Sequence, residues 1–233
     1  MGTSKSYISL KGGDHTRAKR GLTSFLGGGS VSKQDVAARF ASALKSEARS
    51  SGGGVSSSNS IKNYGSNAAR FISFLGNVNS GGLSYASEQA KFSSTPKSVD
   101  EMIKLFTESD ISDTIDTTVT AVALKETLDA LVPTLEALQN VNLAEFTKEL
   151  VANIIAVCFE QRYFEDILKK CDSIADAKQK CDEIKKYIHS DIVVSLDTSA
   201  VNKIHADTNV LSSFIEKKCN EALEILINFY DLK

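Results

Sequence analysis

The residue with the most distinctive chemistry is Gly2, because removal of Met1 would make its α-amine the N-terminus of the chain. Such an amine has a pKa of about 7.7–8.0, so a fair fraction of it is neutral and nucleophilic near neutral pH. Glycine has no Cβ, which lets a chain that begins with it enter a narrow tunnel. Gly2 is therefore a candidate site of covalent modification.

The four residues that follow could dock this tip into an enzyme. Thr3, Ser4 and Ser6 carry hydroxyls for hydrogen bonds, and Tyr7 adds a ring that can stack. The start also fits the M-G-x-x-x-[ST] pattern of N-myristoylation, with Ser6 at its last position. A third interpretation is an unmodified tail that only keeps the protein soluble.

Motifs typical of enzymes are missing from the sequence. The glycine clusters lack the Gly-Lys-Ser/Thr of a P-loop, and no expected strand precedes them as in a dinucleotide-binding fold. There is also no Gly-x-Ser-x-Gly nucleophile elbow. We therefore expect no intrinsic catalytic activity and no cofactor.

The four cysteines, Cys158, Cys171, Cys181 and Cys219, follow no zinc-binding spacing. Cys158 lies on the apolar side of the longest expected helix, which favours packing in the core. A metal site formed by Cys171, Cys181 and His189 is a minor alternative. We expect no metal.

The two ends of the 233-residue chain differ in charge and composition. Residues 1–95 have 12 Lys/Arg and 4 Asp/Glu, a net charge of +8, whereas residues 96–233 have 15 and 25, a net charge of −10. All 14 glycines lie at or before Gly82. The most apolar run, Ile154–Phe159, is far shorter than the roughly 20 residues that span a bilayer. We expect a cytoplasmic protein with reduced cysteines and no membrane partner.

The Gly/Ser-rich front predicts little regular structure. Residues 1–31 show no persistent period and are expected to form a flexible tail. Residues 32–97 are expected to form a low-complexity arm with two amphipathic helices, capped by Ser32 and Ser60. The second helix is expected to end near Gly81-Gly82, with a polar loop over residues 84–95.

Residues 98–233 predict an all-α domain, a helical bundle behind that arm. Ser98 with Glu101, and Asn142 with Glu145, form N-terminal cap signatures. Ile192-Val193-Val194 is the one short strand candidate. After a first helix that begins at Ser98, the expected helices span residues 112–131, 143–170, 173–189 and 200–230, and the second of these is expected to be central.

Three short motifs carry a resemblance to a known family. The chain opens with Met1-Gly2-Thr3-Ser4-x-Ser6-Tyr7, has Ala69-Arg70-Phe71 and Phe74-Leu75 in an expected helix, and later has the run from Glu160 to Ile167, E-Q-R-Y-F-E-D-I. Together these resemble the QatB family of the bacterial Qat anti-phage defence systems. In that family Gly-Gly-Pro tends to follow the tyrosine, whereas Ile8-Ser9-Leu10 stand there in this chain.

The resemblance implies a non-catalytic adaptor that works with three partners: a QueC-like enzyme, a P-loop ATPase and a TatD-like nuclease. The QueC-like enzyme would join 7-carboxy-7-deazaguanine to the Gly2 amine through an amide. Thr3, Ser4, Ser6 and Tyr7 would then be the residues that the enzyme recognises.

The helical domain would bind the ATPase. Four residues of the E-x-R-x-F-x-D-I run, Glu160, Arg162, Phe164 and Asp166, are the candidate partner-binding positions.

The basic front leaves further interpretations open. Arg17, Lys19 and Arg20 form a small cluster that could contact phosphates, but no stacking aromatic residues are interleaved with it. We therefore expect contact with nucleic acid only indirectly, through partners. The same front could instead contact the acidic helical domain of its own chain, or an acidic partner.

Overall fold

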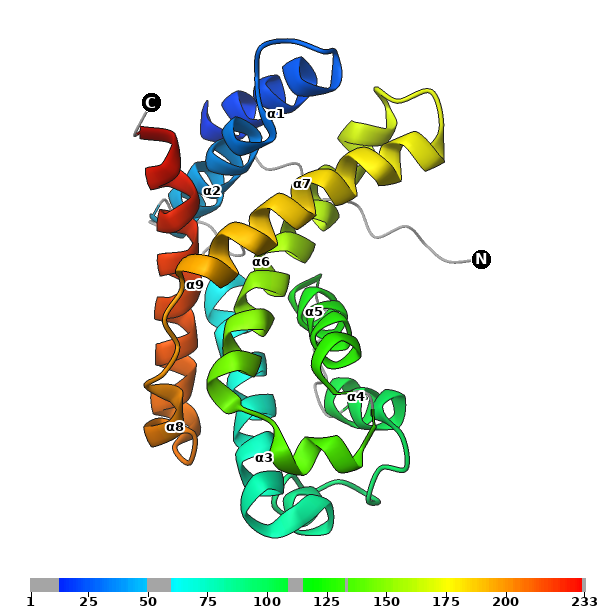
Figure 1. The fold of residues 1–233 in the computed structure, drawn as a ribbon, viewed down its shortest axis with the longest axis vertical. Coiled ribbons are helices and arrows are strands. Elements are labelled where there is room, and N and C mark those ends of the chain that lie inside the picture. Colours follow the sequence, from blue (N-terminus) through cyan, green and yellow to red (C-terminus); the bar gives the residue numbers. More distant parts are fainter. Residues whose placement is uncertain (1–12, 50–59, 109–114, 133, 232–233) are drawn as a thin grey trace.

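The computed structural model describes residues 13–49, 60–108, 115–132 and 134–231 (Figure 1). Within these ranges the chain forms nine α-helices and one short 3-10 helix, and no strand. The prediction of an all-α fold is confirmed for the part of the chain that is described. The strand candidate Ile192-Val193-Val194 is helical, because it continues α7 (Ile174–Ser195).

Helix α6 (Leu143–Leu168) is the centre of the fold. It begins at the predicted cap, where Asn142 Oδ1 accepts hydrogen bonds from the backbone N–H groups of Ala144 and Glu145 at 3.0 and 3.3 Å. Every residue from Leu150 to Phe159 is buried. A helix that is buried on all its faces must be enclosed by other elements.

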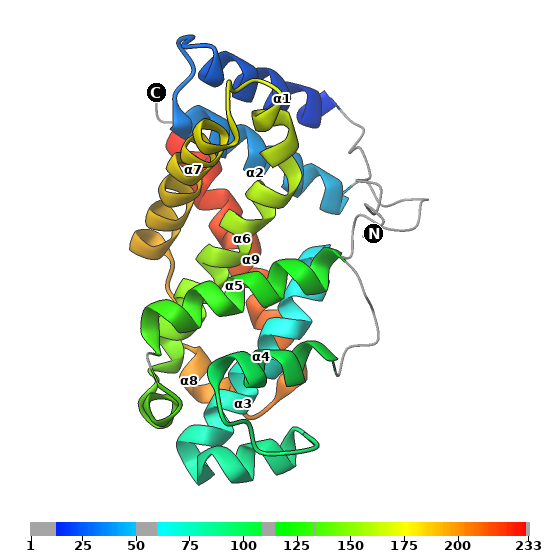
Figure 2. The ribbon, with the colours of Figure 1, turned by 90° about the vertical axis from the view of Figure 1, so that its right-hand side faces the viewer.

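The enclosing helices come from both halves of the sequence (Figures 1 and 2). Helix α7 and α5 (Ile115–Leu131) pack on α6 from the acidic half. Helices α3 (Ser60–Gln89) and α9 (Thr208–Asp231) pack along each other and also contact α6. Helix α2 (Lys33–Arg49) lies against α9 and α7.

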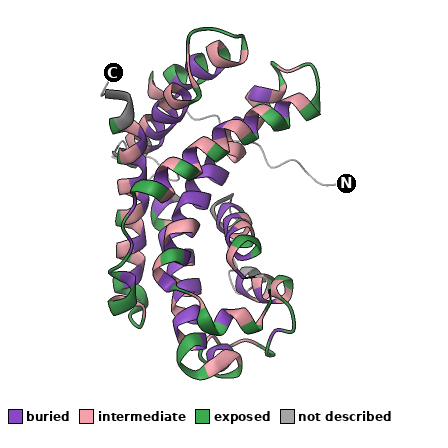
Figure 3. Ribbon diagram, in the orientation of Figure 1, coloured by how far each residue is buried: buried purple, intermediate pink, exposed green. Residues whose placement is uncertain are grey.

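One continuous hydrophobic core joins these helices, and Figure 3 shows its buried positions along their facing sides. It extends from Ala18 and Phe40 near the N-terminus to Leu226 in α9. The sequence predicts residues 32–97 as an arm in front of a separate domain, but α2 and α3 contribute to the same core as α6 and α9. The apolar faces of the two amphipathic helices are thus buried within the chain.

Helix α1 (Gly13–Leu26) departs from the sequence-based prediction of a flexible tail over residues 1–31. Of that range, the structure places residues 13–26 in a helix that packs on α2 and contacts α6. Gly21 lies inside this helix, where glycine costs about 1 kcal/mol relative to alanine. The prediction of a flexible tail is therefore wrong for these residues, because burial of Ala18 and Leu22 against the core outweighs weak helix propensity.

Several predicted helix boundaries also shift. Helix α3 bends at Gly82, which has φ +81°, close to the predicted end, but its helical structure continues to Gln89 through the expected loop. Residues 200–230 form two helices, α8 (Val201–Ile204) and α9, and Asp207 caps α9 by accepting from two backbone N–H groups. Helix α4 (Val99–Glu108) begins at the predicted capping residue Ser98, whose Oγ accepts from the Glu101 N–H at 3.1 Å.

Gly65 explains how α3 and α9 come so close together. A Cβ at this position would lie 3.1 Å from the carbonyl oxygen of Ser212 and 3.2 Å from the backbone nitrogen of Glu216. Both atoms belong to the backbone of α9, so they cannot rotate away as a side chain can. Gly65 thus weakens α3 locally but allows the two helix backbones to approach.

We therefore predict that Gly65→Val lowers the free energy of unfolding by about 1–3 kcal/mol, because the branched side chain must push α9 away from α3. Denaturant unfolding followed by circular dichroism measures the change. Ser66→Val is the matched control, since Ser66 is the next residue of the same helix and is exposed. It should change stability by less than about 0.5 kcal/mol. Equal effects of the two substitutions would contradict this account of the α3–α9 contact.

Candidate functional site

The N-terminal candidates, Gly2 with Thr3, Ser4, Ser6 and Tyr7, lie outside the described residues. The first described residue is Gly13, at the beginning of α1. The second group of candidates, the run from Glu160 to Ile167, forms the C-terminal part of α6.

The four candidate residues of this run do not form one surface. Residues four apart share a face of a helix, so Glu160 lies over Phe164, and Arg162 lies over Asp166. Glu160 is directed to α7, where it pairs with Lys185, whereas Asp166 is directed to α1, where it pairs with Lys19. The run therefore connects α6 to two different helices.

Lys185 joins three helices through two carboxylates. Its Nζ lies 2.6 Å from Glu160 Oε2 on α6 and 3.0 Å from Glu126 Oε1 on α5, and its side chain is 14% exposed. Burial on its own would lower the pKa of Lys185, but the hydrogen bonds and charges of Glu160 and Glu126 outweigh burial and raise that pKa. Lys185 therefore stays protonated and holds the two acids together.

The opposite face of the run holds α1. Lys19 Nζ lies 2.9 Å from Asp166 Oδ2, and His15 Nδ1 lies 3.4 Å from the hydroxyl of Tyr163. Both His15 and Tyr163 are buried. The Tyr163 ring also meets Phe40 of α2 edge-on, with ring centroids 5.9 Å apart. Three helices, α1, α2 and α6, thus meet around Tyr163.

Arg162 and Phe164 are both half-buried, and Phe164 packs against the hydrophobic core. Between them along the chain lies the buried Tyr163, and Glu165 after them is exposed. The structure therefore gives Glu160 and Asp166 roles inside the molecule and leaves part of the surface of Arg162 and Phe164 open to solvent.

The basic front contacts the acidic back of its own chain, one of the alternatives that the charge distribution left open. Besides the pair between Lys19 and Asp166, Lys45 Nζ of α2 lies 2.6 Å from Glu224 Oε1 of α9. These pairs are partly exposed, so each contributes at most about 1 kcal/mol. They orient α1 and α2 more than they stabilise them.

The cysteines are structural within the described part of the chain. Cys158, Cys181 and Cys219 are buried, which confirms the prediction that Cys158 packs in the core, and Cys171 is half-buried. Burial, and to a smaller extent the nearby charge of Glu160, raises the pKa of the Cys181 thiol to about 12. Among residues 13–49, 60–108, 115–132 and 134–231, no group of three or more His, Cys, Asp or Glu side chains could hold a metal ion.

Sequence reasoning did not find an open pocket of about 480 Å³ between the beginning of α4, the end of α5 and the 3-10 helix η1 (Glu136–Asn140). Its charged side chains have both signs, and Lys125 Nζ lies 2.8 Å from Asp100 Oδ1. The pocket brings the beginning of α4 together with a later stretch that runs from Lys125 to Glu136, so no local pattern could have indicated it. Its charged lining residues are Lys97, Asp100, Lys125, Asp129 and Glu136.

These features define a class of protein: an all-helical body that holds a pair of N-terminal helices against its acidic half. No helix in the described ranges is long and apolar enough to cross a bilayer. A family model described as "Qat anti-phage system associated protein QatB" matches residues 52–226. The chain belongs to this family and is a component of a Qat anti-phage defence system. No curated protein and no solved structure matches the chain.

The family match confirms the resemblance inferred from the short motifs. It begins after α2, so α1 and α2 lie outside it, whereas α6 and its E-x-R-x-F-x-D-I run lie inside it. Sequence reasoning did not identify Lys19, His15 and Lys185 as partners of that run. Their contacts join residues between 25 and 148 positions apart, for which a single sequence carries no signal.

We predict that Cys181 makes stability fall with rising pH above about 9. An open-chain thiol ionises near pH 9, whereas the folded thiol keeps its proton up to about pH 12. The unfolded state therefore binds fewer protons in this range, and the free energy of unfolding falls by about 1.4 kcal/mol per pH unit for this group. The free energy of unfolding, measured with denaturant at several values between pH 8 and 11, should fall less steeply with pH in Cys181→Ala, by this amount per pH unit.

Cys171→Ala is the control for this measurement, because Cys171 is only half-buried and its thiol pKa is raised less. It should leave most of the slope unchanged. If Cys181→Ala retained the full slope of the wild-type chain, the buried Cys181 thiol would not be its source.

Proposed function

We propose that this chain is a non-catalytic adaptor of its Qat defence system, whose Gly2, exposed by removal of Met1, is modified by a partner enzyme. Membership of the QatB family carries the proposal, together with the opening Met1-Gly2-Thr3-Ser4-x-Ser6-Tyr7 that is similar to the tip of that family. The enzyme would be QueC-like and would attach 7-carboxy-7-deazaguanine.

The proposed reaction is the formation of an amide. ATP activates the carboxylate of 7-carboxy-7-deazaguanine, and the neutral Gly2 amine attacks the carboxylate carbon. The C–N bond forms as the activating group leaves, and the amine loses a proton. A QueC-type enzyme ordinarily uses ammonia here and then dehydrates the primary amide to a nitrile. The amide of Gly2 is secondary and cannot be dehydrated in this way, so the reaction stops at the protein adduct.

The residue types of the tip support this role. A Cβ at position 2 would crowd a tunnel shaped for glycine. The hydroxyls of Thr3, Ser4 and Ser6 could be held by hydrogen bonds and the Tyr7 ring by stacking.

We predict that Gly2→Val lowers the extent of modification at least tenfold when the chain is produced together with the other components of its Qat system. The intact mass and the mass of the N-terminal peptide measure the adduct. Gly12→Ala is the matched control, because it also adds a Cβ to a glycine of the N-terminal segment but lies ten residues away from the amine. It should leave modification unchanged.

Three other results of the mass measurement would each lead to a different conclusion. A myristoyl increment on Gly2 would replace the proposal with lipid attachment. An unmodified Gly2 in both infected and uninfected cells would overturn it. An adduct that persists after deletion of the QueC-like gene would show that another enzyme makes it.

We further propose that the helical body binds the P-loop ATPase of the system and presents the modified tail to it, and that it reaches the TatD-like nuclease through this complex. The half-buried Arg162 and Phe164 support a contact at the end of α6, because both expose part of their side chains there, and arginine and aromatic residues are enriched among the residues that dominate binding at interfaces.

We predict that Arg162→Ala reduces co-purification of the full-length chain with the ATPase at least fivefold. Glu165→Ala is the matched control, since Glu165 is exposed on the same helix. The full-length chain is required, because α2 and α3 share a core with α9, and a fragment of residues 96–233 would expose that core. Unchanged co-purification of Arg162→Ala, with folding intact, would exclude the end of α6 as the binding surface.

A further inference from the structure

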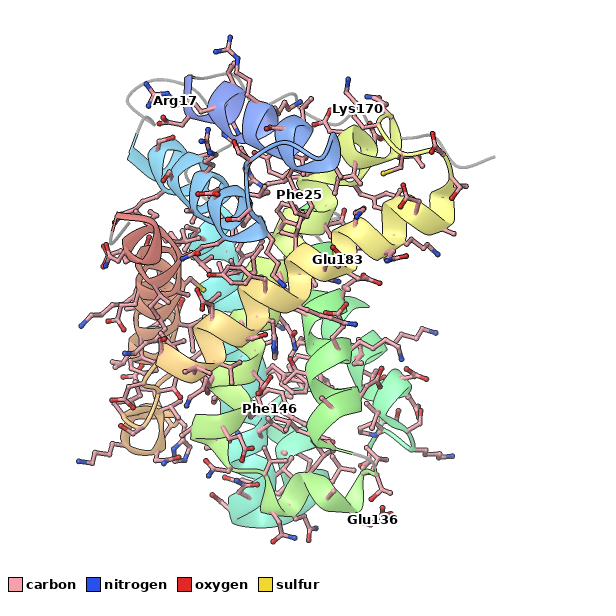
Figure 4. The ribbon with its side chains drawn as sticks, turned by 45° about the horizontal axis from the view of Figure 1, so that its top comes forward. Arg17, Phe25, Glu136, Phe146, Lys170 and Glu183 are labelled. Carbon is pink, nitrogen blue, oxygen red and sulfur yellow. The ribbon has the colours of Figure 1, made fainter. Side chains whose placement is uncertain are left out.

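Two kinds of contact hold α1 on α2 and on the end of α6, and this position on the body is called the seat of α1. His15, Ala18 and Leu22 are each at most 4% exposed, so one face of α1 is buried. Lys19 pairs with Asp166 at 2.9 Å on the adjacent side. Figure 4 shows α1, with Arg17 and Phe25, lying beside the end of α6 that leads to Lys170.

Gly21 adds a close contact between α1 and α2. A Cβ at this position would lie 2.6 Å from Cδ of Arg39, so the arginine side chain lies directly against α1 at this glycine and would have to shift to admit a larger residue. Gly21 thus lowers the helix propensity of α1 but allows close packing between α1 and the Arg39 side chain of α2. The position of α1 is fixed by tertiary contacts, and its N-terminal residue, Gly13, is held at a defined place on the body.

This seat limits the reach of the N-terminus. Gly2 lies eleven positions before Gly13, and an extended chain spans at most about 3.6 Å per position, so the Gly2 amine stays within about 40 Å of Gly13. If α1 left its seat, the first anchored residue would be Lys33, at the beginning of α2. The limit would then rise to about 110 Å, because Gly2 lies 31 positions before Lys33.

We propose that Tyr163 and Asp166 of α6 are positioning residues: they hold His15 and Lys19 of α1, so that the tail leaves the body at Gly13 and its modified end stays close to a partner bound there. This inference rests on the proposed function, in which one partner engages both the helical body and the modified tail. It assigns part of the E-x-R-x-F-x-D-I run to the presentation of the tail.

The length of the tether sets the expected size of the effect. The local concentration of a tethered group falls roughly as the −3/2 power of the tether length. Lengthening the tether from 11 to 31 residues therefore lowers that concentration about fivefold. The gain in affinity that the modified tail provides should fall by the same factor, whereas the affinity of the body itself should not change.

The experiment measures the affinity of the full-length chain for the ATPase component of its Qat system, with Gly2 fully modified and in the unmodified Gly2→Val background. The ratio of the two affinities is the gain from the tail. We expect Leu22→Asp, which places a carboxylate at a position that is 2% exposed, to release α1 and reduce this gain about fivefold. Hydrogen exchange of the amides of residues 13–26 verifies the release.

A charge exchange tests the α6 residue directly. Asp166→Lys should reduce the gain, because it places a second cation beside Lys19, and the double variant Lys19→Asp/Asp166→Lys should restore it. Arg17→Asp is the matched control, since it makes the same change of charge on α1 at a side chain that is 77% exposed. A purely structural role would not predict rescue of the gain by the exchange.

Each outcome decides the inference. A gain that persists in Leu22→Asp after α1 has lost its protection would overturn the positioning role and leave the proposed function intact. If the wild-type chain showed no gain from modification, presentation of the tail would fail, and the positioning role with it, although hydrogen exchange would still report a seated α1. Should Leu22→Asp unfold the whole chain, the charge exchange and its rescue decide alone.

Discussion

The burial of α6 on all its faces is the constraint on which the rest of the structure depends. From Leu150 to Phe159 no residue of this helix reaches solvent appreciably, so helices must cover every side of it. The acidic half supplies α5, α7 and α9, but α3 from the basic half is also needed. The division of charge along the sequence is therefore not a division of the fold. Opposite charges from the two halves instead form ion pairs within the chain, Lys19 with Asp166 and Lys45 with Glu224.

The sequence predicted the helices whose ends carry local signals. Asn142, Ser98 and Ser32 all cap helices as expected, because capping involves residues only two or three positions apart. It failed for α1, whose apolar residues Ala18, Leu22, Phe25 and Leu26 do follow helical spacing, because Gly21 and the neighbouring glycines lower the helix propensity of this short segment. The helix is stabilised by its packing on α2 and α6, which follow later in the sequence. Local propensity carries no information about such contacts.

The candidate site was predictable in part for a similar reason. Family membership and the α6 run could be inferred from short motifs, and a family model over residues 52–226 confirms the family. What the run does inside the molecule could not be inferred, because Glu160 and Asp166 meet partners on two different helices. The remaining candidates, Gly2 to Tyr7, lie outside the described residues, so their role stays a prediction from the residue types of the tip.

The contact of α3 with α9 also has a consequence for biosynthesis. Helix α9 extends to Asp231, so the faces of α2 and α3 that it covers have no partner until the ribosome has also made α9. Contacts between residues so far apart in sequence form slowly, and unpaired apolar faces invite aggregation or chaperone binding in the meantime. A chain whose translation stops before α9 keeps those faces exposed. The fold thus makes the burial of the two amphipathic helices depend on a segment that is synthesised more than a hundred residues later.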